Sequence, residues 1–296
     1  SRGLGDVYKR QLYNGSKRLK TIQQEKLNNQ VAELDVATSE NSIQESIAQI
    51  YIQILYAAES VRVNENTLQV SIAQRDRGQE LLNAGSIAKS DFAQLEAQVS
   101  TDRYQLVTAQ ATLQDYKLQL KQLLELDGEN EMNIYLPALS DENVLSPLPA
   151  KRDVYVSALA LRPEIEASKL NVNASELGID IAKSGYLPTV SLSAGIGTNH
   201  TSGSDFTFSE QVKNGWNNSI GLSVSVPIFN NRQTKSAVQK AKLQYETSML
   251  SLLDEQKALY KTIEGLWLDA NSAQQRYAAA NEKLKSTQIS YNLISE

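Results

Sequence analysis

The sequence contains no cysteine, and this absence excludes disulfide bonds and thiolate metal sites. Large aromatic side chains are also rare, because the 296 residues include only 4 Phe and 2 Trp. Gln, Asn, Ser and Ala are abundant instead, and this composition suits long helices better than one large compact core. The formal net charge of −5 is mild, and no basic cluster reaches the density typical of nucleic-acid-binding proteins. We therefore expect no nucleic-acid partner.

Long apolar runs are missing as well. The longest span about five residues, such as Ile54–Ala58, whereas a transmembrane helix needs about 20. The first segment, Ser1–Gln11, has no periodic pattern, and its letters SRGLGDVYKRQ resemble a translated sequencing-adapter scar. We expect residues 1–11 to be a non-native N-terminal scar that supplies no patterned membrane strand. A native loop or strand is the alternative.

The spacing of apolar residues predicts two long helices. From Lys17 the chain contains neither Pro nor Gly until Gly78. In this stretch apolar residues recur every seven positions, at Ile47, Ile54, Val61 and Leu68. A second set with the same spacing lies beside them, at Ile43, Ile50 and Ala57. The repeat resumes at Phe92, Val99, Leu106, Leu113 and Leu120, with Leu95, Ala109, Tyr116 and Leu123 beside it. Because a sustained heptad repeat packs one helix against another, residues 12–126 are predicted to form an antiparallel coiled-coil hairpin.

The predicted tip of this hairpin, about residues 83–91, reads NAGSIAKSD. Asn83 and Gly85 can adopt the left-handed conformation that ends a helix. Ser90 or Asp91 can cap the next helix, and the Asp91 carboxylate also suits the positive end of that helix. The segment 127–184 is irregular at first, with one possible short strand at MNIYLP. It then becomes helical from Lys151 to about Ser184, with a break at Pro163.

Two segments alternate with a period of two, as strands do. Their apolar positions are Val190, Leu192, Ala194, Ile196, Ile220, Leu222, Val224 and Val226. Small residues occupy the positions between, including Thr189, Ser191, Ser193, Ser219, Ser223 and Ser225. The connection 198–215 is polar and too long for a tight turn. After Asn230 a further long helix is predicted to run to Glu296.

The alternation fits either a half-buried soluble sheet or a membrane β-barrel. The polar face carries Ser, Thr and Gly but none of the Lys and Glu usual on a solvated sheet. Each strand is close to the 9–11 residues that span a bilayer when tilted. Tyr186 and Trp216 lie near the strand ends, where aromatic residues of membrane proteins gather. These features favour the barrel.

The chain also contains an internal repeat. Displacing the sequence by 216 positions aligns the two long helices without a gap. The shared helix start places Asn14 opposite Asn230, and further along Tyr51 falls opposite Trp267. Identity is low, but the apolar face stays in phase, so we interpret the chain as an internal duplication.

This organisation resembles the TolC-like outer-membrane efflux family. The segment NAGSIAKSDFAQLEAQ (Asn83–Gln98) is similar to the family's helix-hairpin tip, and RPEIEASKLNVNASELGIDIAKSGYLPTVSLSAG (Arg162–Gly195) to its approach to the second strand pair. The resemblance implies a mainly α homotrimer, in which long helices build a tunnel and the strands a transmembrane β-barrel. The apolar strand positions would then face lipid, and the small polar positions would face the lumen.

The resemblance also implies a domain layout. Residues 12–126 would form the first-repeat hairpin, 127–184 an equatorial region, and 185–229 an outer-membrane β-hairpin with an extracellular loop at 198–215. Residues 230–296 would form the second-repeat descending helix. The 216-residue offset places the second tip just past Glu296. We therefore expect an internal fragment that lacks its signal peptide, first strand and helix, and last helix.

The implied function is a passive exit duct across the periplasm and outer membrane of a Gram-negative bacterium. Its tip would contact a periplasmic adaptor protein and, through it, an inner-membrane pump. The implied tip residues are Asn83, Gly85, Ser86, Ile87, Ser90 and Asp91, and the Asp91 carboxylate would help to hold the tip closed. We expect no enzyme activity, cofactor or metal, and we interpret His200 as a solvent-exposed loop residue. A periplasmic adaptor or a structural coiled-coil protein is the alternative, and the sequence does not identify the cargo.

Overall fold

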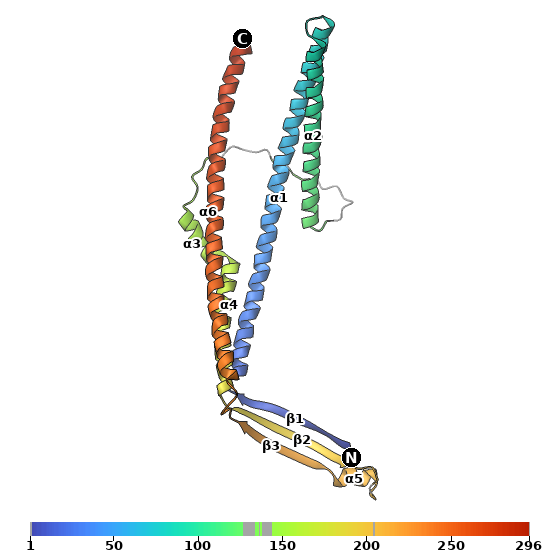
Figure 1. The fold of residues 1–296 in the computed structure, drawn as a ribbon, viewed down its shortest axis with the longest axis vertical. Helices are drawn as coiled ribbons and strands as arrows, with labels where there is room; N and C mark the ends of the chain where they lie inside the picture. The colour runs from blue at the N-terminus through green and yellow to red at the C-terminus, as the bar shows by residue number, and fades with distance from the viewer. Residues whose placement is uncertain (1, 127–133, 136, 138–143, 204, 296) are drawn as a thin grey trace. The chain divides into compact units, whose positions relative to one another are not determined.

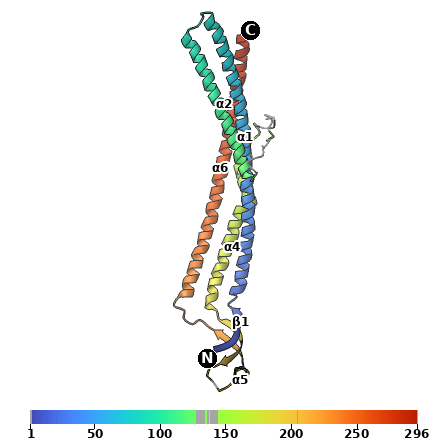
Figure 2. The same ribbon diagram turned by 90° about the vertical axis from the view of Figure 1, so that its right-hand side faces the viewer.

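The computed structural model describes residues 2–126, 134, 135, 137, 144–203 and 205–295, and the possible strand at 132–137 falls largely outside them. The elements, in order, are β1 (Arg2–Asn14), α1 (Lys17–Asn83), α2 (Lys89–Leu123), α3 (Lys151–Leu161), α4 (Pro163–Lys183), the 3-10 turn η1 (Ser184–Tyr186), β2 (Thr189–His200), α5 (Phe208–Asn214), β3 (Asn217–Ser225) and α6 (Gln233–Ser295). Figures 1 and 2 show these elements in two views. The chain divides into two compact units, Ser39–Asn143 and the remainder, Ser1–Thr38 with Val144–Glu296. The fold is therefore mainly α with a small antiparallel sheet, as predicted.

The unit Ser39–Asn143 contains α2 and the part of α1 beside it, whereas the coiled-coil hairpin was predicted over residues 12–126 (Figure 2). The buried residues of α1 are Ile54, Ala57, Leu68, Ser71 and Gly78. Their spacings of 3, 11, 3 and 7 all fall on the two core positions of one heptad repeat. Their partners on α2 include Val99 and Leu120. A methyl group added at Gly78 would collide with Leu95 Cδ1, so the two helices approach each other closely there. Ile43, predicted to belong to the apolar seam, is 49% exposed instead.

In the other unit, α4 packs along α6 (Figure 1). Small side chains at Ala167 and Ala174 are buried in α4 and allow the helices to approach, and Ile165 fills the space beside them with 1% of its surface exposed. The start of α1 lies on the same helix, because Gln24 Nε2 donates a hydrogen bond of 2.8 Å to the Ala174 carbonyl. The break predicted at Pro163 separates α3 from α4, since Pro fits the first turn of a helix but not its interior.

The three strands form one antiparallel sheet in the order β1-β2-β3 (Figure 1). Strand β1 pairs with β2 from Arg2 opposite His200 to Asn14 opposite Thr189, so residues 2–11 form a strand, whereas the prediction was that residues 1–11 supply no patterned membrane strand. Ladder hydrogen bonds use only backbone groups, so the free edge of β2 can pair with a segment whose side chains show no alternation. The alternation of apolar and small polar side chains that marks β2 and β3 is absent from β1.

The internal repeat has a structural counterpart at the start of both long helices. Gly15 and Ser16 have φ values of 66° and 63°, and the residues 216 positions later, Asn231 and Arg232, have values of 50° and 61°. The first helical hydrogen bonds also correspond, from Lys20 N to Ser16 O and from Ser236 N to Arg232 O. The same pair of left-handed residues therefore turns the chain into a helix twice.

A second pair of equivalent residues contacts the connection between the two repeats. Tyr51 Oη donates to the Tyr135 carbonyl at 2.8 Å, and Trp267 Nε1 donates to the Pro149 carbonyl at 3.2 Å. These two aromatic residues lie 216 positions apart, as the sequence alignment predicted. In both copies an aromatic side chain thus donates a hydrogen bond to a backbone carbonyl of the segment that connects the two repeats.

Candidate functional site

The hairpin tip is a short exposed turn, Ala84–Ala88, between α1 and α2. Gly85 has a φ of 70°, and its position has no neighbouring atom within 4 Å of an added Cβ. The Ser86 amide donates to the Leu81 carbonyl at 2.8 Å, which satisfies one of the free carbonyls at the end of α1. Ile87 is half-buried, whereas Asn83, Gly85, Ser86, Ser90 and Asp91 are exposed. These side chains are therefore available to a partner.

The prediction that Ser90 or Asp91 caps α2 was wrong. The N-cap residue is Ala88, which makes no side-chain capping hydrogen bond. Because the helix starts two to three residues earlier than predicted, Ser90 and Asp91 lie inside its first turn. Asp91 there still suits the positive helix N-terminus. The Asp91 carboxylate accepts a hydrogen bond of 3.4 Å from the Ser90 hydroxyl in this first turn.

The second candidate surface is the sheet, whose register separates the predicted residues into two faces. Val190 pairs with Val224, Leu192 with Leu222, and Ala194 with Ile220. Directly paired residues share a face of the sheet, so these side chains form one apolar surface. Leu222 is 66% exposed and Ile220 is 84% exposed. The sequence-predicted apolar set is thus brought together and left uncovered by the described residues, with Val226 as the exception below.

The opposite face carries the small polar residues. Thr189 pairs with Ser225, Ser191 with Ser223, and Gly195 with Ser219. The Ser193 hydroxyl donates to the Gly221 carbonyl of β3 at 3.2 Å. This face is smooth, because its glycines have no side chain and its hydroxyls can bond to neighbouring backbone groups. Its residues agree with the predicted small polar set.

Val226 was predicted on the apolar face of the strand but lies outside β3, which ends at Ser225. Pairing stops there because Thr189, the partner of Ser225, begins β2 directly after Pro188. Pro227 follows Val226 and has no amide hydrogen to continue the ladder. Val226 is nevertheless exposed.

The register places charged residues of β1 on the apolar face. Asp6 pairs with Ile196, and Arg10 pairs with Leu192. Charges are absent from the described β2 and β3 positions on this face, so β1 alone interrupts it. The segment 2–14 is therefore a strand by its hydrogen bonds but not by its side-chain pattern.

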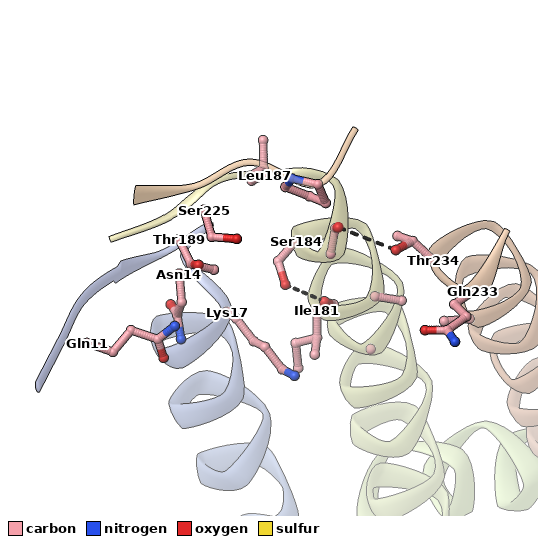
Figure 3. Close-up of a pocket in the computed structure, with 15 residues that line it drawn as sticks. Gln11, Asn14, Lys17, Ile181, Ser184, Leu187, Thr189, Ser225, Gln233 and Thr234 are labelled. Atoms are coloured by element: carbon pink, nitrogen blue, oxygen red, sulfur yellow. Dashed lines mark hydrogen bonds between the residues drawn. The ribbon is translucent and has the colours of Figure 1, made fainter. Parts of the chain in front are cut away.

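Where the sheet meets the helices, a cavity of about 620 Å³ opens between the ends of β1, β2 and β3 and the adjoining helices (Figure 3). Lys17 is the one charged residue among the described residues that line it, and its side chain reaches from α1 toward Ile181. The Thr234 hydroxyl donates to the Gly185 carbonyl at 3.3 Å, which ties α6 to η1. This polar junction fixes where each strand turns into its helix.

A cluster on α6 holds the segment that precedes α3 and the start of α3 itself. Lys151 donates to Glu264 at 2.7 Å and lies 5.0 Å from the centre of the Trp267 ring. Gln274 donates to the Val144 and Ser146 carbonyls. The Lys151 ammonium, followed by the Tyr260 hydroxyl, holds the pKa of the Glu264 carboxyl below its ordinary value. Sequence reasoning missed this cluster, because its members are dispersed over 124 positions between Lys151 and Gln274.

Sequence reasoning also missed α5, since the connection 198–215 was expected to be loop throughout. The start of α5 is a capping box, in which the Thr207 amide donates to Glu210 Oε2 at 3.0 Å. Thr followed three residues later by Glu is a recognised signal of a helix start and was present in the sequence. His200, interpreted as a solvent-exposed loop residue, is instead the half-buried last residue of β2, with its ring 5.1 Å from Phe208.

Two features of the described residues bear on other functions. These residues contain no group of three or more His, Cys, Asp or Glu side chains arranged to hold a metal ion. Within the same part of the chain, none of the helices has an apolar stretch long enough to cross a membrane.

Comparison with known proteins places these features in context. Residues 154–296 match the family described as outer membrane efflux protein. The chain is 24% identical over 259 residues to the outer membrane efflux protein BepC of Brucella suis biovar 1, covering 87% of this chain and 54% of the relative. It is also 24% identical over 278 residues to the outer membrane protein TolC of Escherichia coli strain K12, covering 89% of this chain and 54% of TolC. The chain thus spans about half the length of these relatives.

The fold has close counterparts among solved structures. The outer membrane protein VceC from Vibrio cholerae matches with a TM-score of 0.76 and 18% sequence identity, over 98% of this chain and 66% of VceC. The agreement covers the hairpin, the sheet and the long helices, which the sequence match to residues 154–296 covers only in part. Together, the family match over residues 154–296, the similarity to BepC and TolC and the shared fold show that the chain is similar to the TolC-like outer membrane efflux proteins.

Proposed function

We propose that the chain is part of an outer-membrane channel subunit that serves as the passive exit duct of a tripartite efflux or type I secretion system. The observation that carries this proposal is the two-faced sheet. Its β2 and β3 strands expose an apolar face without charge, and their other face carries Ser, Thr and Gly. An exposed apolar face suits lipid, and a small polar face suits a water-filled lumen. The names of BepC and TolC as outer membrane proteins support this location.

Completion of the barrel requires further strands, because β1 and β3 both present unpaired edges in the described sheet. A closed barrel is the arrangement that satisfies such edges in a membrane. We propose that copies of this subunit supply them in a homotrimer. The helices would then line a tunnel that extends through the periplasm.

A substitution on each face tests the orientation of the sheet. Leu222→Lys would place a charge against lipid, at a cost of about 2–4 kcal/mol near the bilayer midplane. The adjacent Ser223→Lys points to the opposite face and serves as the matched control. We expect Leu222→Lys to reduce the amount of full-length trimer in the outer membrane and Ser223→Lys to leave it nearly unchanged.

Equal tolerance of both substitutions would contradict the proposed lipid face. Purification of the full-length protein as a soluble monomer without detergent would contradict the channel as a whole. That result would favour a periplasmic adaptor or a structural coiled-coil protein instead.

The exposed hairpin tip is the proposed contact with a periplasmic adaptor and, through it, with an inner-membrane pump. Since the sequence contains no cysteine, single cysteines can report this contact. We expect Ser86→Cys at the tip to cross-link to the adaptor in cells. Gln114→Cys, exposed on α2 but far along the helix from the tip, should not cross-link. Cross-linking at Gln114→Cys but not at Ser86→Cys would place the contact elsewhere.

A further inference from the structure

The helix α5 lies over one end of the apolar face of the sheet. Alternation along β2 puts Thr198 and His200 on the same face as Leu192 and Ile196. The Thr198 hydroxyl donates to the Val212 carbonyl of α5 at 3.1 Å, and the His200 ring packs edge-on against Phe208. Thr198 is accordingly buried, whereas Ile196 two residues earlier is 53% exposed. The connection between β2 and β3 therefore turns toward the apolar face rather than toward the small polar face.

The outer side of α5 continues that apolar face. Phe208, Val212, Lys213 and Trp216 surround a shallow hollow of about 470 Å³, together with Ser209. Phe208 and Trp216 are each 57% exposed. Trp216 directly precedes β3, so the aromatic group begins where the apolar strand residues end.

Hydrogen bonds hold the segment in this position. Glu210 and Thr207 form the capping box at the start of α5. The Gln211 side chain accepts from the Thr201 amide and donates to the Phe206 carbonyl, both at 2.8 Å. These bonds fix the start of α5 and the turn before it, and therefore the position of Phe208.

We propose that α5 and Trp216 form an interfacial anchor whose partner is the lipid surface of the outer leaflet, at the level of the headgroups. Trp concentrates at the boundary between hydrocarbon and water, and Phe is common on the apolar side of helices that lie there. Lys213 can extend its ammonium group to headgroup phosphates while its methylene chain stays beside Trp216. The occupant is lipid because the patch continues a face that the proposed function already assigns to lipid, and the inference rests on that function.

The test uses the fluorescence of single-tryptophan variants of the full-length protein in lipid vesicles that contain brominated phospholipids. The first variant keeps Trp216 alone, and the second keeps Trp267 alone as a control on α6, away from the sheet. The third carries Leu222→Trp as its single tryptophan and reports on the middle of the apolar face. Bromine quenches nearby tryptophan, so lipids brominated near the headgroup and near the chain end report depth separately.

We expect the emission of Trp216 to fall most with bromine near the headgroup, that of Leu222→Trp to fall most with bromine deep in the chains, and that of Trp267 to change least. Loss of Trp216 emission to aqueous acrylamide rather than to brominated lipid, with Leu222→Trp still quenched by lipid, would overturn the anchor and leave the proposed channel intact. Protection of Trp216 from both quenchers would show burial against protein and would also overturn the anchor. If lipid quenches neither Trp216 nor Leu222→Trp, the proposed function fails together with the anchor.

Discussion

The repeated left-handed turns at Gly15 and Asn231 predict unequal tolerance for substitution by alanine. The two residues are equivalent by the 216-residue offset, and both have positive φ, 66° and 50°. Their surroundings differ, since Gly15 is buried and Asn231 is exposed. We therefore expect Gly15→Ala to destabilise the start of α1 more than Asn231→Ala destabilises the start of α6.

The structure provides the magnitude. A Cβ at Gly15 would lie 2.8 Å from Leu187 Cβ and 2.9 Å from the Ser184 carbonyl oxygen, neither of which can rotate away. The left-handed conformation costs an alanine about 1–2 kcal/mol, and overpacking costs about 1–3 kcal/mol more. The smaller freedom of the unfolded chain offsets about 0.4–1 kcal/mol, which leaves a loss of about 1.5–4 kcal/mol. Asn231→Ala carries only the conformational cost, at most about 1–2 kcal/mol.

Hydrogen exchange of backbone amides measures the two sites in one experiment. The Lys20 amide bonds to Ser16, and the equivalent Ser236 amide bonds to Arg232, so each reports the opening of its own helix start. At about 1.4 kcal/mol per factor of ten, Gly15→Ala should accelerate exchange at Lys20 by about 10- to 1000-fold. Asn231→Ala should accelerate exchange at Ser236 by about 30-fold or less.

Equal acceleration at the two sites would refute this reasoning, because it would show that the contacts around Gly15 add nothing to the conformational cost. A Gly15→Ala variant with unchanged exchange would refute it more strongly, since even the positive φ would then carry no cost. The comparison is internal to each variant, because the untouched repeat serves as the control for the altered one.

Three further predictions follow from other contacts. Ile54→Ala should cost about 2–5 kcal/mol and lower the thermal midpoint of the full-length protein, whereas Ile43→Ala should change it little, since Ile54 is 0% exposed and Ile43 is 49% exposed. Thr207→Ala should remove the capping box, at a cost of about 1 kcal/mol, and hydrogen exchange should accelerate in α5 but not in the neighbouring strands. Because the folded-state pKa of Glu264 is depressed, its contact with Lys151 stabilises the fold above the ordinary carboxyl pKa and is lost as the pH falls through the lower folded value. Acid titration of Trp267 fluorescence should show this loss, and Glu264→Gln should abolish it.

Local patterns predicted the helices other than α5 and two of the three strands. Residues on the hairpin seam, such as Ile54 and Leu68, are buried as the heptad requires. The alternation in β2 and β3 appears as two distinct faces, with Leu192 opposite Leu222 and Ser191 opposite Ser223. These features were predictable because a periodic sequence determines which side of an element is apolar, whatever that side later packs against.

Other features depend on partners that periodicity does not reveal. The strand β1 forms through backbone pairing to the edge of β2, which leaves no trace in side chains such as Asp6 and Arg10. The cluster around Glu264 joins side chains from distant parts of the chain, so no local pattern marks it. The helix α5 is different, because its capping box was readable at Thr207 and was overlooked in a polar connection.

The repeat shows which property the duplication has preserved. Gly15 and Ser16 in the first copy have become Asn231 and Arg232 in the second, with different size, charge and burial, yet both pairs keep positive φ. Equivalent aromatic residues, Tyr51 and Trp267, likewise differ in chemistry but each donates one hydrogen bond to a backbone carbonyl. The two copies therefore share the backbone conformation at these positions, although their side chains differ. In the proposed conduit this backbone geometry is the property that matters, because the work of the duct would depend on where the strands turn into helices.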